Sequence, residues 1–161
     1  MRTAVLTIST SVARRESEDV AGPLLARLAD EAGAEVVAIE VIGDDAALIE
    51  DRLRAYVEGG TTFVLTTGGT GLTPDDVTPE ATAAVVERDV PGIAEAMRAA
   101  SLQHTPMGVL SRGVSGVAGR TLIVNFPGNP KAVEQLFGLL APVLRHAAAT
   151  LASEGGSRAS H

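Results

Sequence analysis

The sequence contains no cysteine and no tryptophan, and aromatic residues make up only 2% of its 161 positions. Without cysteine it has no disulfide framework, no thiol nucleophile and no cysteine-ligated metal site. Positive charge is also scarce, since 13 lysines and arginines stand against 20 aspartates and glutamates, for a net charge of −7. This balance argues against nucleic acid or an anionic membrane surface as a partner. No apolar run reaches the ~20 residues that a membrane span requires, and no signal-peptide layout follows Met1, so we expect a cytoplasmic protein.

What the chain does contain is aliphatic. Hydrophobic residues make up 45% and charged residues 20% of the sequence, as in ordinary globular domains. A core of Ala, Val, Leu and Ile suits a buried parallel sheet that helices cover on both faces. The length corresponds to one domain of ordinary size. We expect this domain to span 1–152, and the small polar residues of 153–161 to form a disordered tail.

Strand-like and helix-like segments alternate along the chain. Strand composition occurs at 3–8, 35–42, 63–65 and 121–124, and apolar residues at helical spacing occur at 20–28, 49–57, 81–86, 93–97 and 133–144. This alternation predicts an α/β fold, doubly wound, with a mostly parallel sheet and helices on both faces. We expect 107–110 to be a short strand or an extended segment, 111–119 to be a covering loop, and Pro142 to kink the last helix.

The most informative stretch is a glycine-rich turn after the third strand. It contains Gly68, Gly69 and Gly71 and leads into a helix, for which Thr78 is the expected N-cap and Pro79 the first helical residue. Glycines let backbone N–H groups approach a phosphate, and the helix dipole favours negative charge there. The sequence therefore predicts an anion cradle, and the alternative is a tight strand-to-helix turn without a ligand.

Two carboxylates, Asp75 and Asp76, lie inside this turn. They would repel a bare phosphate, so their presence favours a divalent cation between the protein and the phosphate. Asp76 is the first candidate for a functional carboxylate, and the alternative is that either residue only caps a turn. The turn lacks the Gly-Lys-Ser/Thr ending of a Walker A motif, so it is not an ordinary P-loop.

Polar residues also follow the two earlier strands. Ser9, Thr10 and Ser11 follow the first strand, and Asp44 and Asp45 follow the second. The carboxyl ends of parallel strands meet at one edge of a sheet, where ligands gather. We therefore expect these residues to converge with the glycine-rich turn. Asp44 has an alternative role as the cap of the following helix, and the two roles are compatible.

A second turn rich in proline and glycine, at 125–131, precedes the last helix. Lys131 either neutralises a phosphate or a pyrophosphate leaving group or is a solvated surface lysine, and Arg112 leaves the same choice open. The three histidines cluster neither with one another nor with acidic residues, so we do not expect them to bind a metal. Ser9 and Ser11 have no nearby histidine, which gives a hydrolase triad little support.

Residues 66–81, with GGTG followed by DVTPEA, resemble the signature loop of the molybdopterin-binding domains of molybdenum-cofactor biosynthesis. The second turn, NFPGNPK, is similar to that family's other signature, and the similarity covers roughly residues 3 to 150. Among its members, the chain looks most like the stand-alone adenylyltransferases. The resemblance implies transfer of AMP from ATP to the terminal phosphate of molybdopterin, release of pyrophosphate and a need for Mg²⁺. It also implies a homotrimer and hand-over to a molybdenum-insertion protein.

Carried onto this chain, the family's two key acidic positions fall on Asp44 and Asp76, as catalytic and metal-binding residues. The expected substrate- and nucleotide-binding residues are polar and glycine positions of the strand ends and the two turns: Ser9, Thr10, Thr67, Gly68, Gly69, Thr70, Gly71, Thr73, Asp75, Thr78, Ser111, Asn125, Pro127, Gly128, Asn129 and Lys131.

Two positions depart from the family's pattern. Thr10 stands where the family has Asp, and Asp75 stands where it has Arg. A Pro-Asp-Asp loop is similar to the related domain of competence-damage proteins, which hydrolyse nucleotide-like pyrophosphates. Two alternatives therefore remain beside the adenylyltransferase: a metal-dependent pyrophosphatase, and a pterin-binding module without catalysis.

Overall fold

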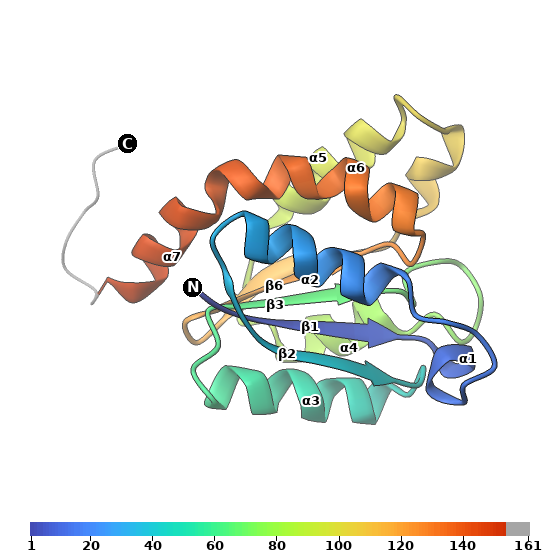
Figure 1. Cartoon of the computed structure of the whole chain (residues 1–161), viewed down its shortest axis with the longest axis horizontal. Coiled ribbons are helices and arrows are strands. Elements are labelled where there is room, and N and C mark those ends of the chain that lie inside the picture. The colour runs from blue at the N-terminus through green and yellow to red at the C-terminus, as the bar shows by residue number, and fades with distance from the viewer. Residues whose placement is uncertain (154–161) are drawn as a thin grey trace.

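A six-stranded sheet runs through the middle of the computed structural model, which describes residues 1–153 (Figure 1). In the spatial order β2-β1-β3-β6-β5-β4, the strands are β1 (Arg2–Ile8), β2 (Glu35–Ile42), β3 (Phe63–Thr67), β4 (Arg88–Asp89), β5 (Ser115–Ala118) and β6 (Thr121–Phe126). The pairs β1–β2, β1–β3 and β3–β6 are parallel, whereas β5 is antiparallel to β4 and β6. The prediction of an α/β fold with a mostly parallel sheet is confirmed.

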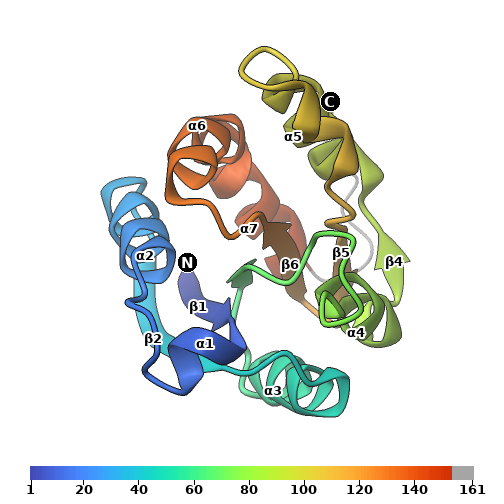
Figure 2. The same ribbon diagram turned by 90° about the vertical axis from the view of Figure 1, so that its right-hand side faces the viewer.

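Helices cover both faces of the sheet (Figure 2). They are α1 (Thr10–Ala13), α2 (Ala21–Glu31), α3 (Ala46–Glu58), α4 (Thr78–Val85), α5 (Pro91–Ser101), η1 (Pro106–Leu110), α6 (Pro130–Leu140), η2 (Ala141–Val143) and α7 (Leu144–Ala152), where η marks a 3-10 helix. Helices α2, α5, α6 and α7 share one apolar core with the sheet, and α3 and α4 share the other. The predicted doubly wound arrangement is therefore confirmed.

The central strands divide their side chains between these two cores. Val5 of β1 and Leu65 of β3 are buried on the face of α2 and α6, whereas Leu6 and Val64 are buried on the face of α3 and α4. Successive side chains of a strand point to opposite faces, so both sets are needed to fill the two cores. Burial on both faces explains why these strands are continuous apolar runs in the sequence.

The antiparallel edge of the sheet was only partly foreseen. Residues 111–119 are not entirely a loop, because Ser115–Ala118 forms β5 and pairs with β6 across a tight turn at Gly119, where φ is +56°. Strands this short carry little sequence signal, and the two-residue edge strand β4, which pairs with β5, was not predicted at all. The segment 107–110 is also not extended, since it lies in the 3-10 helix η1.

Two helix starts differ from the expectation. Thr78 is not the N-cap of α4: it is the first helical residue, and its hydroxyl donates to the carbonyl of Gly68 at 3.0 Å. Helix α3 is capped by Asp45, whose carboxylate accepts from the N–H of Leu48. Pro142 lies in η2, which separates α6 from α7 where a kink was expected. Of the expected tail 153–161, residues 154–161 lie outside the described part of the chain.

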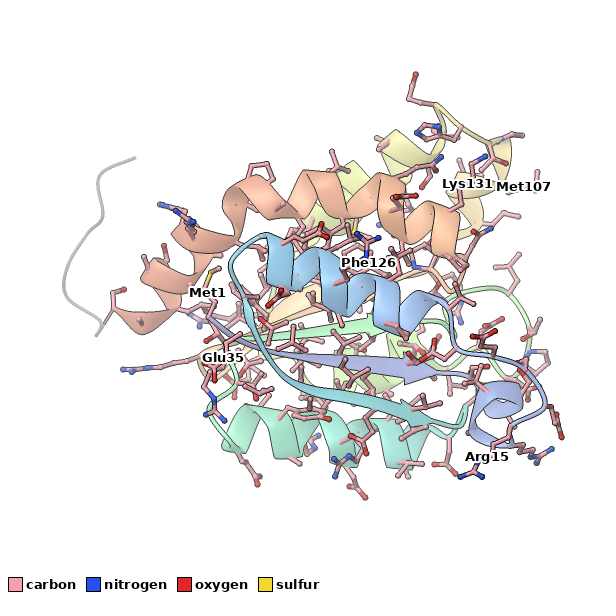
Figure 3. All side chains as sticks on the ribbon, viewed as in Figure 1. Met1, Arg15, Glu35, Met107, Phe126 and Lys131 are labelled. Atoms are coloured by element: carbon pink, nitrogen blue, oxygen red, sulfur yellow. The ribbon has the colours of Figure 1, made fainter. Side chains whose placement is uncertain are left out.

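Strands β1, β2, β3 and β6 all end at the same edge of the sheet. In Figure 3, Arg15, Met107 and Lys131 lie toward this edge, whereas Met1 and Glu35 lie at the opposite one. The expected convergence of the strand ends is therefore confirmed. Over residues 1–153, no helix has the length and hydropathy that crossing a bilayer would require.

Candidate functional site

A cavity of about 480 Å³ opens at the carboxyl edge of the parallel strands. Both predicted catalytic carboxylates, Asp44 and Asp76, line it. The other lining residues come from the strand ends, the start of α2 and the two glycine-containing turns: Thr7, Ile8, Ser9, Val12, Glu18, Asp19, Val20, Ala21, Thr67, Gly68, Gly69, Gly128 and Pro130. The structure thus brings together residues that are far apart in the sequence, around a polar hollow.

Gly68 and Gly69 shape the wall of this cavity through their backbone. Their φ angles are +100° and +65°, in the left-handed region that favours glycine. A Cβ atom at Gly68 would collide with the carbonyl oxygen of Ile8, and one at Gly69 would collide with the hydroxyl of Thr78. The N–H of Gly68 donates to Phe126 at 3.1 Å, so this amide is engaged within the fold. The turn therefore requires glycine for its close packing against Ile8 and Thr78, and the approach of its N–H groups to a phosphate stays a prediction.

Asp44 is tied to the segment after β1. The N–H and the hydroxyl of Thr10 both donate to Oδ2 of Asp44 at 2.8 Å, and the N–H of Asp44 donates back to Thr10 Oγ1 at 3.0 Å. A carboxylate at position 10 would place a second negative charge at this distance, whereas threonine supplies a donor. Because Asp45 caps α3, Asp44 remains directed at the cavity.

Asp76 is held by its own turn. Its Oδ2 accepts from the N–H of Thr73 at 2.9 Å and from the hydroxyl of Thr73 at 2.7 Å. Burial alone raises the pKa of Asp76. The hydrogen bonds from Thr73, a backbone hydrogen bond from Gly71 and the charge of Arg112 lower this pKa by more than burial raises it, so the net pKa lies below the ordinary value. The carboxylate is therefore ionised at neutral pH. Asp75 next to it is exposed.

The second turn supports the first. Thr67 donates from its hydroxyl to the carbonyl of Pro127 at 2.7 Å. A Cβ atom at Gly128 would lie 3.3 Å from the Cα of Gly68, so the two turns touch at their backbones. Asn129 caps α6 by accepting from the N–H of Lys131 at 2.9 Å. The cavity wall therefore depends on both signatures at once.

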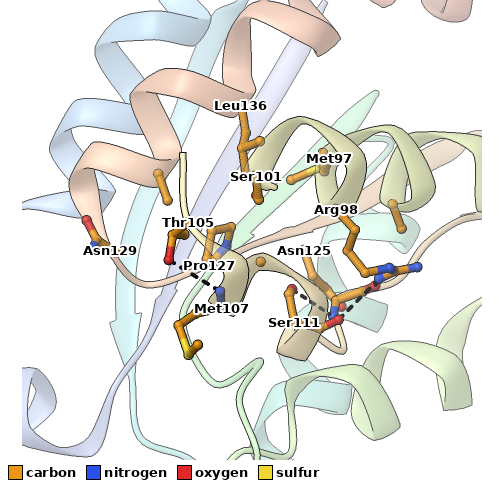
Figure 4. Close-up of a pocket in the computed structure, with 14 residues that line it drawn as sticks. Met97, Arg98, Ser101, Thr105, Met107, Ser111, Asn125, Pro127, Asn129 and Leu136 are labelled. Carbon is orange, nitrogen blue, oxygen red and sulfur yellow. Dashed lines mark hydrogen bonds between the residues drawn. The ribbon is translucent and has the colours of Figure 1, made fainter. Parts of the chain in front are cut away.

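A smaller hollow of about 220 Å³ lies on the other side of the second turn (Figure 4). Its lining includes Ser111, Asn125, Pro127 and Asn129 from the predicted set. The remaining lining residues come mainly from α5, η1 and α6: Ala94, Met97, Arg98, Ser101, Thr105, Met107, Gly108, Gly113, Ala132 and Leu136. Most of these are apolar or small, so this hollow differs in character from the carboxylate-lined cavity. The predicted site residues that line a hollow are therefore divided between two of them. Seven others line neither: Thr10, Thr70, Gly71, Thr73, Asp75, Thr78 and Lys131.

Asn125 has a buried role that its sequence position did not reveal. Its side-chain amide donates to the hydroxyls of Thr66 at 2.9 Å and Thr82 at 3.0 Å, and its carbonyl accepts from the N–H of Val114 at 3.2 Å. Three of the four hydrogen-bonding directions of its side chain are used, and they go to β3, α4 and the segment before β5. Asn125 therefore joins β3, α4 and the segment before β5 behind the second turn.

Two acidic residues of the cavity lining were missed, and the role of Lys131 near it was left undecided. Glu18 and Asp19 line the cavity, although the sequence placed them only in a polar loop. Asp19 accepts from the hydroxyl of Thr7 at 2.8 Å and from the N–H of Gly22 at 2.9 Å, which anchors the start of α2. The connection after β1 begins at the edge of the sheet where the cavity lies, so the chain topology could have placed Glu18 and Asp19 near it. Lys131 is exposed, in the first turn of α6.

The cavity suits a metal ion for which the protein supplies only one or two ligands and the substrate and water supply the others. Among residues 1–153, no group of three or more His, Cys, Asp or Glu side chains is placed to hold a metal ion. The hydrogen bonds to Asp44 and Asp76 all use Oδ2, which leaves the Oδ1 atoms out of these contacts. Mg²⁺ prefers oxygen ligands and is often bound by one or two carboxylates together with substrate phosphates. The two carboxylates therefore fit Mg²⁺ only jointly with a phosphate ligand.

A doubly wound sheet with a polar cavity at its carboxyl edge defines the class of α/β domains whose ligand sites lie at the ends of the parallel strands. The chain belongs to the family described as probable molybdopterin binding domain, which matches residues 4–146. This result confirms the resemblance inferred from the two signature turns.

Several named proteins are similar to this chain. The molybdopterin adenylyltransferase of Haemophilus influenzae is 47% identical over 96 residues, which cover 59% of this chain and 49% of that protein. The molybdenum cofactor biosynthesis bifunctional protein of Synechococcus elongatus is 37% identical over 147 residues, covering 91% and 46%. The crystal structure of the molybdopterin biosynthesis enzyme MoaB from Thermus thermophilus superposes with a TM-score of 0.88 at 42% identity, covering 93% and 95%. The chain spans between about a quarter and a half of the length of the first curated relatives.

Proposed function

We propose that this chain is a molybdopterin adenylyltransferase, which transfers AMP from ATP to the terminal phosphate of molybdopterin. The observation that carries the proposal is the pairing of Asp44 and Asp76 on the wall of a cavity shaped by Gly68 and Gly69. The relative from Haemophilus influenzae that bears this activity in its name supports the choice of substrates. An oxygen of the molybdopterin phosphate attacks the α-phosphorus of ATP, the bond between the α-phosphorus and the bridging oxygen breaks, and pyrophosphate leaves.

Each part of the cavity has a role in this reaction. At Gly68 and Gly69 the cavity wall is backbone without side chains, which leaves room for the phosphates, and Asp44 and Asp76 on the same wall would hold the cation that accompanies them. The chemistry that Mg²⁺ would supply when held by these carboxylates is positive charge for the developing transition state. Lys131, exposed beside the second turn, is available to the departing pyrophosphate. Thr10 keeps Oδ2 of Asp44 in place by two hydrogen bonds.

A second candidate is a metal-dependent pyrophosphatase. It is favoured by the acidic character of the cavity, since Glu18 and Asp19 line it together with Asp44 and Asp76. A pyrophosphatase needs water as the acceptor and no molybdopterin. A third candidate is a pterin-binding module without catalysis, which would give Asp44 and Asp76 no chemical role. The three candidates differ in what they do to ATP.

Incubation with ATP, Mg²⁺ and molybdopterin is expected to release pyrophosphate in proportion to the molybdopterin added. The adenylyltransferase needs all three components, because the acceptor phosphate supplies the attacking oxygen. Pyrophosphate or phosphate release that is equally fast without molybdopterin would favour the pyrophosphatase. Tight molybdopterin binding without any pyrophosphate would leave only the binding module.

We also propose that three copies assemble and that the product passes to a molybdenum-insertion protein. An apolar groove of about 320 Å³ between α5, β5 and α7, with Ile93, Val117 and Leu151 in its lining, offers a surface for such contacts. The bifunctional relative from Synechococcus elongatus supports the hand-over, because this chain covers only 46% of it. Light scattering at micromolar concentration is expected to give three times the mass of one chain. A mass near 16.5 kDa would contradict the trimer.

A further inference from the structure

The segment that carries Asp76 has little holding it in place. Residues 71–76 belong to neither apolar core, and Leu72 within them is 64% exposed. The hydrogen bonds from Thr73 to Asp76 close the turn internally but do not attach it to the domain. A carboxylate that must meet a cation and a phosphate needs a fixed position, since a displacement of about 1 Å can cost a hundredfold in rate. The attachment of this turn therefore matters for the chemistry.

Arg112 provides that attachment from the segment before β5. Its Nε donates to the carbonyl of Gly71 at 2.7 Å, and its Nη2 donates to the carbonyl of Asp76 at 2.6 Å. Its own N–H donates to the carbonyl of Thr70 at 2.9 Å. One guanidinium thus holds both ends of the turn, at a separation that its planar set of donors can bridge and a lysine cannot.

Glu80 keeps the guanidinium in this orientation. Nη1 of Arg112 forms an ion pair with Oε1 of Glu80, in the first turn of α4. The side chains are 35% and 58% exposed, so this pair adds little to the stability of the whole protein. What the arginine contributes is local, because its other donors go to the backbone of the turn.

We propose that Arg112 is a positioning residue that fixes the turn 71–76 and, through it, the carboxylate of Asp76. The inference rests on the proposed function in one respect, namely that Asp76 acts on the substrate phosphates. Arg112 itself makes no contact with them in this scheme. Arg112 lies before β5 and Asp76 lies after β3, so these hydrogen bonds link the segment before β5 to the first signature turn at the cavity wall.

Two variants test this, Arg112→Met, which keeps the apolar stem, and Arg112→Lys, which keeps the charge. Hydrogen exchange is expected to become at least about tenfold faster for the amides of 71–77 in Arg112→Met, while the amides of β1 and β3 are unchanged. Arg112→Lys is expected to recover only part of the protection, because an ammonium cannot reach both carbonyls at once. Glu80→Gln is the matched control, and it should retain most of the protection.

A double-mutant cycle gives the catalytic readout. Arg112→Met is expected to lower kcat about tenfold or more with a smaller change in KM for ATP, and to add less than about twofold when Asp76 is already Asn. Unchanged exchange in 71–77, or equal losses of kcat in both backgrounds, would overturn the positioning role. If the wild-type protein shows no transferase activity, the proposed function fails, and the exchange experiment alone then decides whether Arg112 fixes the turn.

Discussion

Replacement of Asp76 by Asn is expected to lower kcat by about a hundredfold or more, equivalent to ~2.7 kcal/mol, without unfolding the protein. An amide oxygen can still accept the two hydrogen bonds from Thr73, so the turn should keep its shape. What is lost is the negative charge, which the low pKa of Asp76 otherwise maintains at neutral pH. Steady-state pyrophosphate release at saturating ATP, together with thermal unfolding, measures both effects.

Asp75→Asn is the matched control for that variant. It removes the same charge one residue away, from an exposed side chain of the same turn. Its expected kcat lies within about twofold of the wild-type value, as for a surface charge that is screened by solvent. Wild-type turnover in Asp76→Asn, or an equal loss in Asp75→Asn, would rule out a specific role for Asp76 at the cation.

Gly68→Ala is expected to damage stability and activity together. Alanine at a φ of +100° is strained, and its Cβ would meet the carbonyl oxygen of Ile8 in β1. Strain of this kind costs about 1–3 kcal/mol, and the clash adds to it. For a chain of this length, a loss of about 2 kcal/mol lowers Tm by roughly 4–8 °C. Because the same displacement moves the cavity wall, kcat should fall by more than the unfolded fraction explains.

Gly138→Ala is the matched control for the glycine. Gly138 lies within α6, and nothing stands within 4 Å of an added Cβ there. Alanine in a helix is favoured over glycine by about 0.5–1 kcal/mol, so this variant should be at least as stable as the wild type. Differential scanning calorimetry at one fixed protein concentration compares the two. A Gly68→Ala protein with wild-type Tm and kcat would contradict the close approach at the cavity wall.

The positions of the strands and the glycine-rich turn could be predicted because their signals are local. Runs such as 63–65 are apolar on both faces, and the glycines after them permit few other conformations. The short strands β4 and β5 could not be predicted in this way. β5 pairs with the antiparallel edge that β6 offers, and β4 pairs with β5, so both strands depend on long-range pairing.

Neighbouring aspartates show the same limit within the site. The sequence offered Asp44 as a possible cap of α3, but the cap is Asp45, because the carboxylate of Asp44 accepts from Thr10, 34 residues earlier. Likewise Thr78 meets the sequence criteria for an N-cap, but its hydroxyl donates a hydrogen bond to the carbonyl oxygen of Gly68. Competition between a local partner and a distant one is not visible in a single sequence.

Arg112 was left between a phosphate ligand and a surface residue for a similar reason. Its partners, the carbonyls of Gly71 and Asp76, are backbone atoms, which leave no trace in residue type. Glu18 and Asp19 were assigned to a loop because nothing in their spacing indicates that the loop returns to the cavity. That Asp44 and Asp76 are functional therefore stays a prediction from the resemblance, and how the fold holds them is visible only in the structure.

The most direct test of the proposed reaction follows the phosphorus atoms of ATP. Two parallel incubations with molybdopterin and Mg²⁺ use ATP labelled at the α- or at the γ-phosphorus. Adenylyl transfer predicts that the α-label travels with the pterin and that the γ-label is released as pyrophosphate. An α-label that appears only in free AMP, a γ-label on the pterin, or ATP that remains intact would contradict the assignment of Asp44 and Asp76 to adenylyl transfer.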